Sequence, residues 1–442
     1  MVPLGAAEDL VESDLGDSGV VAGIRHAGPI AIAGLVSNGA NVVVTVVIAR
    51  LLTSRGYGEL AQLNGIFLFL SMPGSALLVG VVRRATALRT AGLGATVRRF
   101  AVRLHRLTLA GVVVLTLLAL LLQHEIARAL SLDNAGGIVP IVCAGGIWLA
   151  LSVDRGLLQA RRAYRPLAAN LLVEGGMRMA FVLVLTGAGA GVTGACVGVL
   201  LGEAAAAAHA RFESSRRWAA EAQAPEPGVD PAAVTSRRHL ASDVATAFGC
   251  LAFLALLQNL DVILLGRESP KHSGAYAAIS VASKAIVFGA IALGSYLLPE
   301  ATIRWHRGEH ALRQLATTAL ILAVPVFGLL VASLVAPTFL IRLAFGPRLV
   351  GASASFSTLV GAMAFLCVTV LLTNYLLGAG RRWIVVVLGV GTAAAAVVFY
   401  QAHGDPSRTA RADLVIQALL AGVVGVGFLR VHKVADRRPG LQ

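Results

Sequence analysis

Six polar or charged side chains interrupt stretches of the chain that are otherwise apolar, and their types could support the binding of ions or charged groups. They are Glu174, Arg178, Glu203, Asn259, Asp261 and Lys284. A charge inside a membrane-spanning helix costs roughly 2.5–3.5 kcal/mol on insertion scales, so such residues are by default candidates for function. We expect them to bind or to pair, and we identify no catalytic residue.

The two basic residues of this set, Arg178 and Lys284, each allow more than one interpretation. Glu174 and Arg178 are four residues apart and therefore share one helix face. They could form a self-neutralising pair that fixes helix packing, or Arg178 could face a central cavity and attract an anionic head group. Lys284 has no acidic residue three or four positions away, so it lies either in a cavity or in an ion pair with another helix. A pyrophosphate could bridge Arg178 and Lys284.

The acidic residues are candidates for ion coupling. Asp261, with Asn259 nearby, could carry a proton or a sodium ion, or it could cap or pair structurally. Glu203 has the same two interpretations. Asp154 and Arg155 fall close to a predicted helix end, where we expect them to be interfacial.

Several classes of protein are excluded by missing motifs. Lysine occurs only at positions 271, 284 and 433 and never follows glycine, so no Walker A loop is present. Neither a His-Glu-x-x-His motif nor a nucleophile elbow occurs, and the four cysteines lack metal-ligand spacing. We therefore expect no enzymatic activity, no cofactor and no metal site.

The elements that position these residues are long apolar stretches. The chain of 442 residues is 57% hydrophobic and only 14% charged, and stretches of about 20 apolar residues are long enough to cross a bilayer as helices. The sequence predicts an all-α, polytopic membrane protein with twelve spans. These are 27–49, 59–82, 107–122, 136–158, 166–187, 190–210, 241–266, 274–298, 314–336, 351–376, 383–401 and 413–431. Gly198 and Gly202 form a small-xxx-small pair typical of closely packed helices.

Basic residues predict the orientation. Of the 37 Lys and Arg residues, 25 fall on one side of the predicted membrane and nine on the other, which favours cytoplasmic termini in the cell membrane. The basic residues cluster at helix ends, so anionic lipid rather than nucleic acid is the expected partner. The segment from Val97 to Arg106 is expected to lie as an amphipathic helix on the inner leaflet.

The chain divides into two related halves. We predict an acidic, disordered cytoplasmic tail (1–26), a six-helix bundle (27–210), a cytoplasmic linker (211–240), a second six-helix bundle (241–431) and a basic cytoplasmic tail (432–442). Residues 157–164 resemble residues 376–383, and Gly56-Tyr57-Gly58 resembles Gly274-Ala275-Tyr276. Internal repeats of this kind are typical of secondary transporters, whose substrates bind between the repeats.

Several motifs resemble those of a known family. The segment Ala49-Arg50-Leu51-Leu52-Thr53-Ser54-Arg55-Gly56-Tyr57-Gly58-Glu59-Leu60 is similar to the link after the first helix of O-antigen-type polysaccharide exporters, which belong to the multidrug/oligosaccharidyl-lipid/polysaccharide flippase superfamily. Ser54 departs from the proline that is common there. Further similar segments are 259–264, 274–276, 283–285, Pro299, Phe345-Gly346 and 375–378.

The resemblance covers residues 27–431 and implies two six-helix bundles around a V-shaped cavity that opens alternately to each side. It also implies transport of a glycan linked to undecaprenyl pyrophosphate, with membrane lipids and polysaccharide assembly proteins as further partners. Our leading hypothesis is therefore a flippase for lipid-linked oligosaccharide. The alternatives are a cation-coupled exporter of small molecules or drugs, and a non-transporting membrane scaffold or enzyme partner.

Overall fold

The computed structural model of the protein describes residues 33–34, 36–37, 39–221, 237–306 and 312–436. The predicted N-terminal tail, half of the predicted linker (222–236) and the last residues of the predicted C-terminal tail (437–442) lie outside these ranges. The described residues contain helices and no strands, which confirms the predicted all-α fold class.

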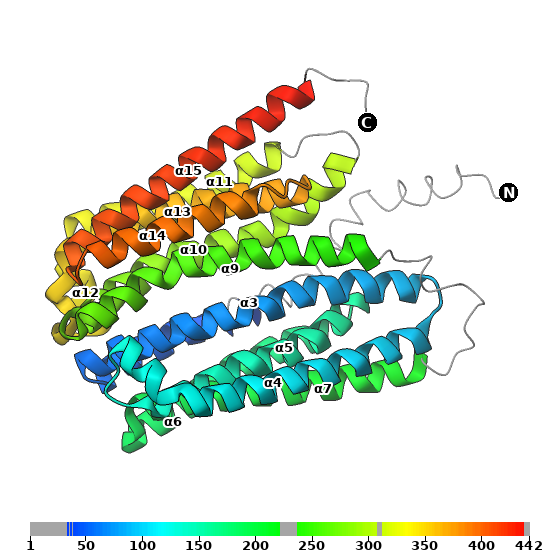
Figure 1. The fold of residues 1–442 in the computed structure, drawn as a ribbon, viewed down its shortest axis with the longest axis horizontal. Helices are drawn as coiled ribbons and strands as arrows, with labels where there is room; N and C mark the ends of the chain where they lie inside the picture. The colour runs from blue at the N-terminus through cyan, green and yellow to red at the C-terminus, as the bar shows by residue number, and fades with distance from the viewer. Residues whose placement is uncertain (1–32, 35, 38, 222–236, 307–311, 437–442) are drawn as a thin grey trace.

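The helices alternate in direction along the chain (Figure 1). The first half contains α3 (Ser54–Thr90), α4 (Gly94–Leu130), α5 (Ile138–Ala160), α6 (Tyr164–Leu185) and α7 (Gly191–Glu221). The second half contains α9 (Arg237–Glu268), α10 (Pro270–His306), α11 (Leu312–Val335), the short α12 (Pro337–Phe345), α13 (Phe356–Gly378), α14 (Ile384–Gln401) and α15 (Pro406–Asp436).

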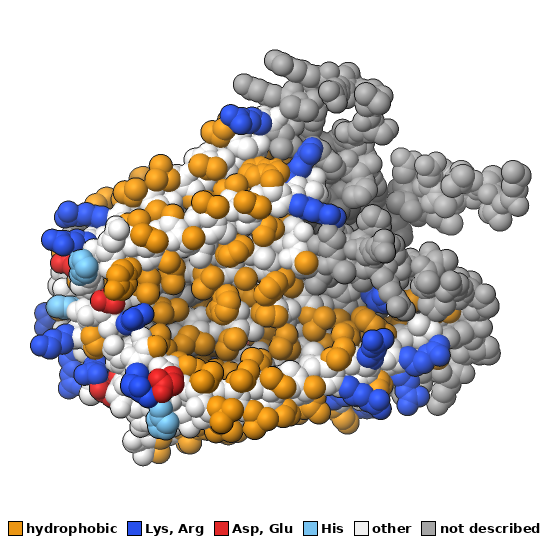
Figure 2. Space-filling view, in the orientation of Figure 1, with side chains coloured by type: hydrophobic (Ala, Val, Ile, Leu, Met, Phe, Trp, Pro, Cys, Tyr) orange, Lys and Arg blue, Asp and Glu red, His pale blue; other side chains and the backbone are white. Residues whose placement is uncertain are grey.

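Ten helical stretches of the described chain are long and apolar enough to cross a membrane. One of them, Tyr164–Trp218, contains both α6 and α7, and a shorter apolar helix, Gly39–Leu51, precedes α3. Together these make twelve spans, as predicted. The visible face of the molecule is apolar across its middle, with Lys and Arg side chains toward its two ends (Figure 2), as expected for a protein that crosses a bilayer.

The helices form two bundles, which we call the N-lobe (α3–α7) and the C-lobe (α9–α15). In Figure 1 the N-lobe is the lower bundle and the C-lobe the upper one. The lobes meet where α3 packs against α9 and α10. The two bundles are therefore joined mainly along one helix, as in transporters whose halves move relative to each other.

The segment predicted to lie on the inner leaflet is instead the start of a spanning helix. Val97 and Ala101 belong to α4, which continues without interruption to Leu130. Their side chains are buried against Val81 of α3 and Leu157 of α5. The prediction was wrong because the apolar face of this segment packs against neighbouring helices and not against lipid. Helix α7 similarly continues to Glu221, inside the predicted linker.

Glycine brings α6 and α7 into close contact. A Cβ atom on Gly198 would lie 2.5 Å from the Val182 Cα atom, and one on Gly202 would lie 2.7 Å from the Arg178 Cα atom. The predicted role of this glycine pair in close helix packing is confirmed. The contact also presses the backbone around Arg178 against α7, where its partner Glu203 is located.

The two segments that resemble each other in sequence end their helices in the same way. After α5, the Ala163 amide donates to the Leu158 carbonyl, and Arg162 has a positive φ of 55°. After α13, the Arg381 amide donates to the Leu376 carbonyl, and Gly380 has a φ of 70°. Both are Schellman turns, and their register differs by one residue from that of the sequence alignment.

Candidate functional site

The N-lobe contains a buried cluster of two carboxylates and two guanidinium groups. Glu174 of α6 accepts from Arg178 at 2.6 Å and from Arg155 of α5 at 2.5 Å. Arg178 also forms an ion pair with Glu203 of α7. Asn170 joins the cluster by accepting from Arg155 Nε at 2.7 Å. The formal charges cancel, as they must when several ions share a site of low dielectric constant.

The C-lobe contains a second buried cluster, centred on Asp261 of α9. The Tyr276 hydroxyl donates to Asp261 Oδ2 at 3.1 Å, and Lys284 Nζ lies 3.7 Å from Asp261 Oδ1. Lys284 also donates to Asn259 Oδ1 at 3.4 Å. Lys284 therefore has partners on the neighbouring helix, which is the second of the two interpretations that the sequence allowed.

A further carboxylate approaches this cluster from α15. Asp413 is fully buried and lies within electrostatic reach of Asp261 and Lys284. Gln417, one turn later, donates to Asp413 Oδ1 at 3.1 Å and to the Leu257 carbonyl at 3.2 Å. Two carboxylates and one ammonium group leave a formal charge of −1. A buried net charge is costly, so this cluster, in contrast to the N-lobe cluster, has room for one more positive charge.

Unpartnered polar atoms occur in both clusters, and in the N-lobe they are Arg178 Nε and Glu203 Oε2. Within the described part of the chain, Asp413 Oδ2 and Gln417 Oε1 are buried without a hydrogen-bond partner, and Asp261 Oδ1 has only its ion pair with Lys284. Two acceptor oxygens therefore lack any partner and a third has only an ion pair, although buried acceptors are rarely left unsatisfied in proteins. A proton or a monovalent cation would supply the missing charge.

The lobes contact each other most closely at the starts of α3 and α10. A Cβ atom on Gly58 would lie 2.6 Å from Ser273 Cβ, and one on Gly274 would overlap the Ser54 carbonyl. Close by, Tyr57 and Phe345 place their rings 6.1 Å apart, and Arg50 donates to the Leu343 carbonyl at 2.6 Å. We call these contacts the seam. The seam therefore joins Gly56-Tyr57-Gly58 to the similar segment Gly274-Ala275-Tyr276.

The seam continues along α3 toward both clusters. Gly65 faces Asn259, so that a Cβ atom on Gly65 would lie 3.3 Å from Asn259 Cβ. Two residues later, the Phe67 ring lies 5.7 Å from the guanidinium carbon of Arg178. The α3 stretch from Gly65 to Phe67 thus contacts one member of each ionic cluster.

The structure distributes the predicted site residues over the two clusters. Glu174, Arg178 and Glu203 lie together in the N-lobe, whereas Asn259, Asp261 and Lys284 lie together in the C-lobe. Both predicted cations are paired with carboxylates, so a pyrophosphate that bridged Arg178 and Lys284 would have to displace those partners. Their role in substrate binding remains a prediction.

Sequence reasoning missed several members of these clusters, among them Arg155, Asp413 and Gln417. Arg155 was expected at the membrane interface, yet it is 5% exposed and paired with Glu174. Asp413 and Gln417 were missed because the last span was predicted to begin at position 413. The signal for an earlier start was present: Asp405 followed by Pro406 is a typical N-cap, and Asp405 Oδ1 accepts from the Ser407 and Arg408 amides at 2.8 Å.

Asp154, also expected at the interface, is buried and connects three helices. It accepts from His105 Nε2 at 2.8 Å and from the Ser214 hydroxyl, and Arg211 lies 3.7 Å away. His105 comes from α4, and Ser214 and Arg211 come from α7. Asp154 is buried although it lies near the end of α5, because helices α4 and α7 extend past α5 and cover it.

Comparison with solved structures identifies the fold. The chain is similar to an inward-facing multidrug resistance MATE transporter of the MOP superfamily, with a TM-score of 0.69, 14% identity, and coverage of 93% of this chain and 100% of the other. An outward-facing MATE structure matches with a TM-score of 0.62, 11% identity, and coverage of 94% and 97%.

A third similar structure comes from a MOP superfamily transporter of Pyrococcus furiosus, whose binding pocket is described as having reversed polarity that suggests a different function. It matches with a TM-score of 0.63, 12% identity, and coverage of 93% and 96%. No protein-family model matches the sequence, and the comparison with curated proteins finds no match. The chain thus has the MATE-like, twelve-helix fold of these structures.

Proposed function

We propose that the protein is a cation-coupled membrane transporter that exports small organic molecules by alternating access of its two lobes. The fold supports this proposal because the similar structures include inward-facing and outward-facing states of multidrug transporters. The proposed coupling rests on one observation: two buried carboxylates, Asp261 and Asp413, lie within electrostatic reach of each other and of a single ammonium group, Lys284.

The net charge of this cluster explains why a cation would be bound. In a buried site the uncompensated carboxylate favours a proton or a monovalent cation, which lowers the cost of keeping the charge away from water. The groups are supplied by α9, α10 and α15. Because three helices of one lobe contribute, occupancy of the site would change how these helices pack against one another.

The route from this site to the lobe interface is short. Lys284 contacts Asn259, and Asn259 packs against Gly65 of the opposite lobe. When a cation neutralises Asp413 or Asp261, the attraction of these groups for Lys284 falls, and its hydrogen bond to Asn259 is free to change. Cation binding would thereby alter the seam, which is the physical requirement for coupling an ion gradient to alternating access.

The contacts of the seam suggest which state is present. Residues 50–58, 268–274 and 343–346 fall on the side that the basic residues predict to be external. Contact between the lobes on that side corresponds to a closed outer end, and the TM-score is higher for the inward-facing relative (0.69) than for the outward-facing one (0.62). We infer an inward-facing state.

The test is transport by the purified full-length protein in liposomes. Uptake of a fluorescent organic cation is followed with an imposed proton gradient, with a sodium gradient, and with neither. We expect one gradient to drive uptake and Asp413→Asn to reduce that uptake by at least about tenfold, which corresponds to about 1.4 kcal/mol. Asp405→Asn, a matched change at the exposed start of the same helix, should leave uptake unchanged.

Gradient-independent uptake by the wild-type protein would contradict coupling. Equal gradient-driven uptake by wild type and Asp413→Asn would remove the C-lobe cluster from the mechanism. Absence of uptake with either gradient, together with outward movement of a lipid-linked oligosaccharide in the same liposomes, would overturn the choice of substrate.

The second candidate is the flippase for lipid-linked oligosaccharide, and one specific observation favours it. The segment Ala49–Leu60, which resembles polysaccharide exporters in sequence, supplies Arg50, Ser54 and Tyr57 to the seam. The residues of the resemblance therefore have a defined place at the lobe interface. Deletion of the gene separates the candidates: a flippase predicts accumulation of lipid-linked glycan on the inner leaflet, whereas a small-molecule exporter predicts sensitivity to its substrates without such accumulation.

A further inference from the structure

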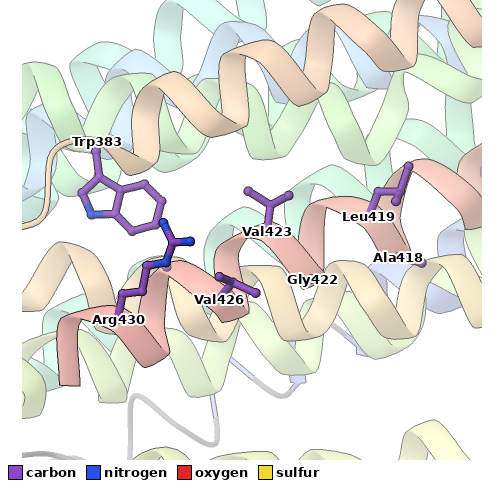
Figure 3. A pocket seen from close by; sticks show the side chains of 8 residues that line it. Trp383, Ala418, Leu419, Gly422, Val423, Val426 and Arg430 are labelled. Carbon is purple, nitrogen blue, oxygen red and sulfur yellow. The ribbon is translucent and has the colours of Figure 1, made fainter. Parts of the chain in front are cut away.

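A groove on the surface of the C-lobe lies between α15 and the start of α14 (Figure 3). Its volume is about 720 Å³. The residues that define it are Trp383, Leu419, Gly422, Val423, Val426 and Arg430. The groove is apolar along most of its length and has one charged residue, Arg430, at the end where Trp383 forms a wall.

The shape of the groove follows from two glycines. At Gly422 a Cβ atom would meet nothing within 4 Å, so this position leaves the floor of the groove open. At Gly427 a Cβ atom would overlap the Trp383 ring, so this position allows the indole to approach α15. The groove therefore exists because small residues stand where leucine or valine would fill the space.

The length of the groove matches one leaflet. From Ala418 to Arg430 the helix rises by about 18 Å at about 1.5 Å per residue, and half of a hydrocarbon core is about 15 Å thick. Leu419, Val423 and Val426 are exposed along this face, as they would be toward acyl chains. Tryptophan is enriched at the boundary between hydrocarbon and head groups, which places Trp383 and Arg430 at head-group level.

The positive charge of Arg430, at the end of the groove, favours a ligand with a phosphate group. Arg430 is exposed, and among the described residues it forms no ion pair with a carboxylate. A guanidinium group binds phosphate through two parallel hydrogen bonds. Basic residues at the predicted cytoplasmic side favour the anionic lipids of the inner leaflet.

We propose that this groove is a binding site for one anionic phospholipid, with an acyl chain along α15 and the phosphate on Arg430. The site is separate from the ionic clusters and does not depend on the proposed transport function. Its ligand is a resident lipid of the inner leaflet and not the transported molecule.

The test is native mass spectrometry of the full-length protein supplied with phosphatidylglycerol or with zwitterionic phosphatidylethanolamine. We expect one phosphatidylglycerol to be retained preferentially, and Arg430→Gln to reduce its occupancy by about tenfold, as loss of one charge-assisted contact of about 1.4 kcal/mol would. Arg408→Gln, at the opposite end of α15, is the matched control and should retain the lipid.

A second pair of variants tests whether an acyl chain occupies the groove. Gly422→Leu fills the groove and should remove the bound lipid, whereas Gly425→Leu, which also has open space around its Cβ position but does not line the groove, should not. Equal retention of both lipids by the wild type, or equal occupancy in Arg430→Gln and Arg408→Gln, would overturn the proposal. So would a wild-type dimer that Gly422→Leu dissociates, because a second copy would then occupy the groove.

Discussion

Asn259 packs against Gly65 across the seam, close enough that a Cβ atom on the glycine would lie 3.3 Å from the asparagine Cβ. Asn259 is also the acceptor for Lys284. On the same helix as Gly65, Phe67 lies over the guanidinium group of Arg178 in the N-lobe. One turn of α3 therefore lies between the two ionic clusters. Within this turn, Gly65 is the residue that Asn259 of the C-lobe approaches.

A larger side chain at Gly65 should separate the two lobes at the seam. Gly65→Leu places a side chain against Asn259 and Ile263, and overpacking of this kind costs about 1–3 kcal/mol. We expect the populations to shift by about tenfold toward a state with the outer ends of the lobes apart, measured by spin-label distances between the lobes. Gly111→Leu on α4, where a Cβ atom meets nothing within 4 Å, is the control. An unchanged distance distribution in Gly65→Leu would argue against a seam at this position.

Removing the lysine of the C-lobe cluster should abolish export while leaving membrane insertion intact. Lys284→Ala leaves two buried carboxylates without an ammonium partner, which costs about 3–5 kcal/mol. We expect a lower thermal unfolding temperature and no gradient-driven transport. Lys271→Ala, at the exposed start of the same helix, should change neither. Normal export by Lys284→Ala would exclude this lysine from the mechanism.

The N-lobe cluster can be tested with a double-mutant cycle. Arg178→Leu leaves Glu174 and Glu203 with only Arg155, and we expect a loss of about 3–5 kcal/mol in the free energy of unfolding. Arg178→Leu combined with Glu203→Leu removes one charge of each sign, so most of that stability should return. Chemical denaturation measures the stability, and the transport assay distinguishes the two interpretations. A stable, active double variant identifies a packing element, whereas a stable, inactive one identifies a binding residue.

Alanine substitutions at two glycines, Gly202 of α7 and Gly176 of α6, should have opposite effects on stability. Gly202→Ala forces a methyl group against the backbone of Arg178, and we expect a loss of about 1–3 kcal/mol. Gly176→Ala, on the other helix of the pair, meets no atom within 4 Å and should be neutral or stabilising by up to about 1 kcal/mol, because alanine favours the helix. Thermal unfolding of the two variants compares them directly. If both stabilise the protein, the close approach of α6 and α7 is not present in the membrane.

The start of α15 should be sensitive to acid. Hydrogen bonds from the Arg408 amide and the Ser407 hydroxyl lower the pKa of Asp405 below its ordinary value. A carboxyl group with a lowered pKa stabilises the folded state above its unfolded pKa and loses that contribution as the pH falls through the folded value. Asp405→Ala should therefore destabilise the helix start by about 1 kcal/mol at pH 7 and by less in acid.

Hydrogen exchange of the amides in the first turn of α15 measures this effect. Asp405→Asn retains a side-chain oxygen that can cap the helix but cannot titrate. At neutral pH the amides of this variant should therefore be protected about as well as in wild type. Their protection should not decrease over the pH range in which Asp405 becomes protonated. Equal pH dependence in wild type and Asp405→Asn would assign the effect to another group.

Properties that depend on one helix alone could be predicted from the sequence. Apolar length determines that a segment spans a bilayer, so the twelve spans and the all-α class followed directly. The placement of Glu174 and Arg178 on one helix face followed from their spacing, and pairing was one of the two interpretations that it allowed. The close packing at Gly198 and Gly202 followed from their size and four-residue interval. In each case the interacting groups are near in sequence or the property is local.

Properties that depend on which helices are neighbours were decided only by the tertiary structure. Asp413 is far from Asp261 in sequence, and nothing in either segment indicates that α15 brings a second carboxylate to the lysine on α10. Arg155 and Asp154 seemed interfacial because they lie near a helix end, but neighbouring helices extend beyond that end and bury them. Apolar periodicity determines which face of a helix is buried, whereas the burial of charge depends on partners contributed by other helices.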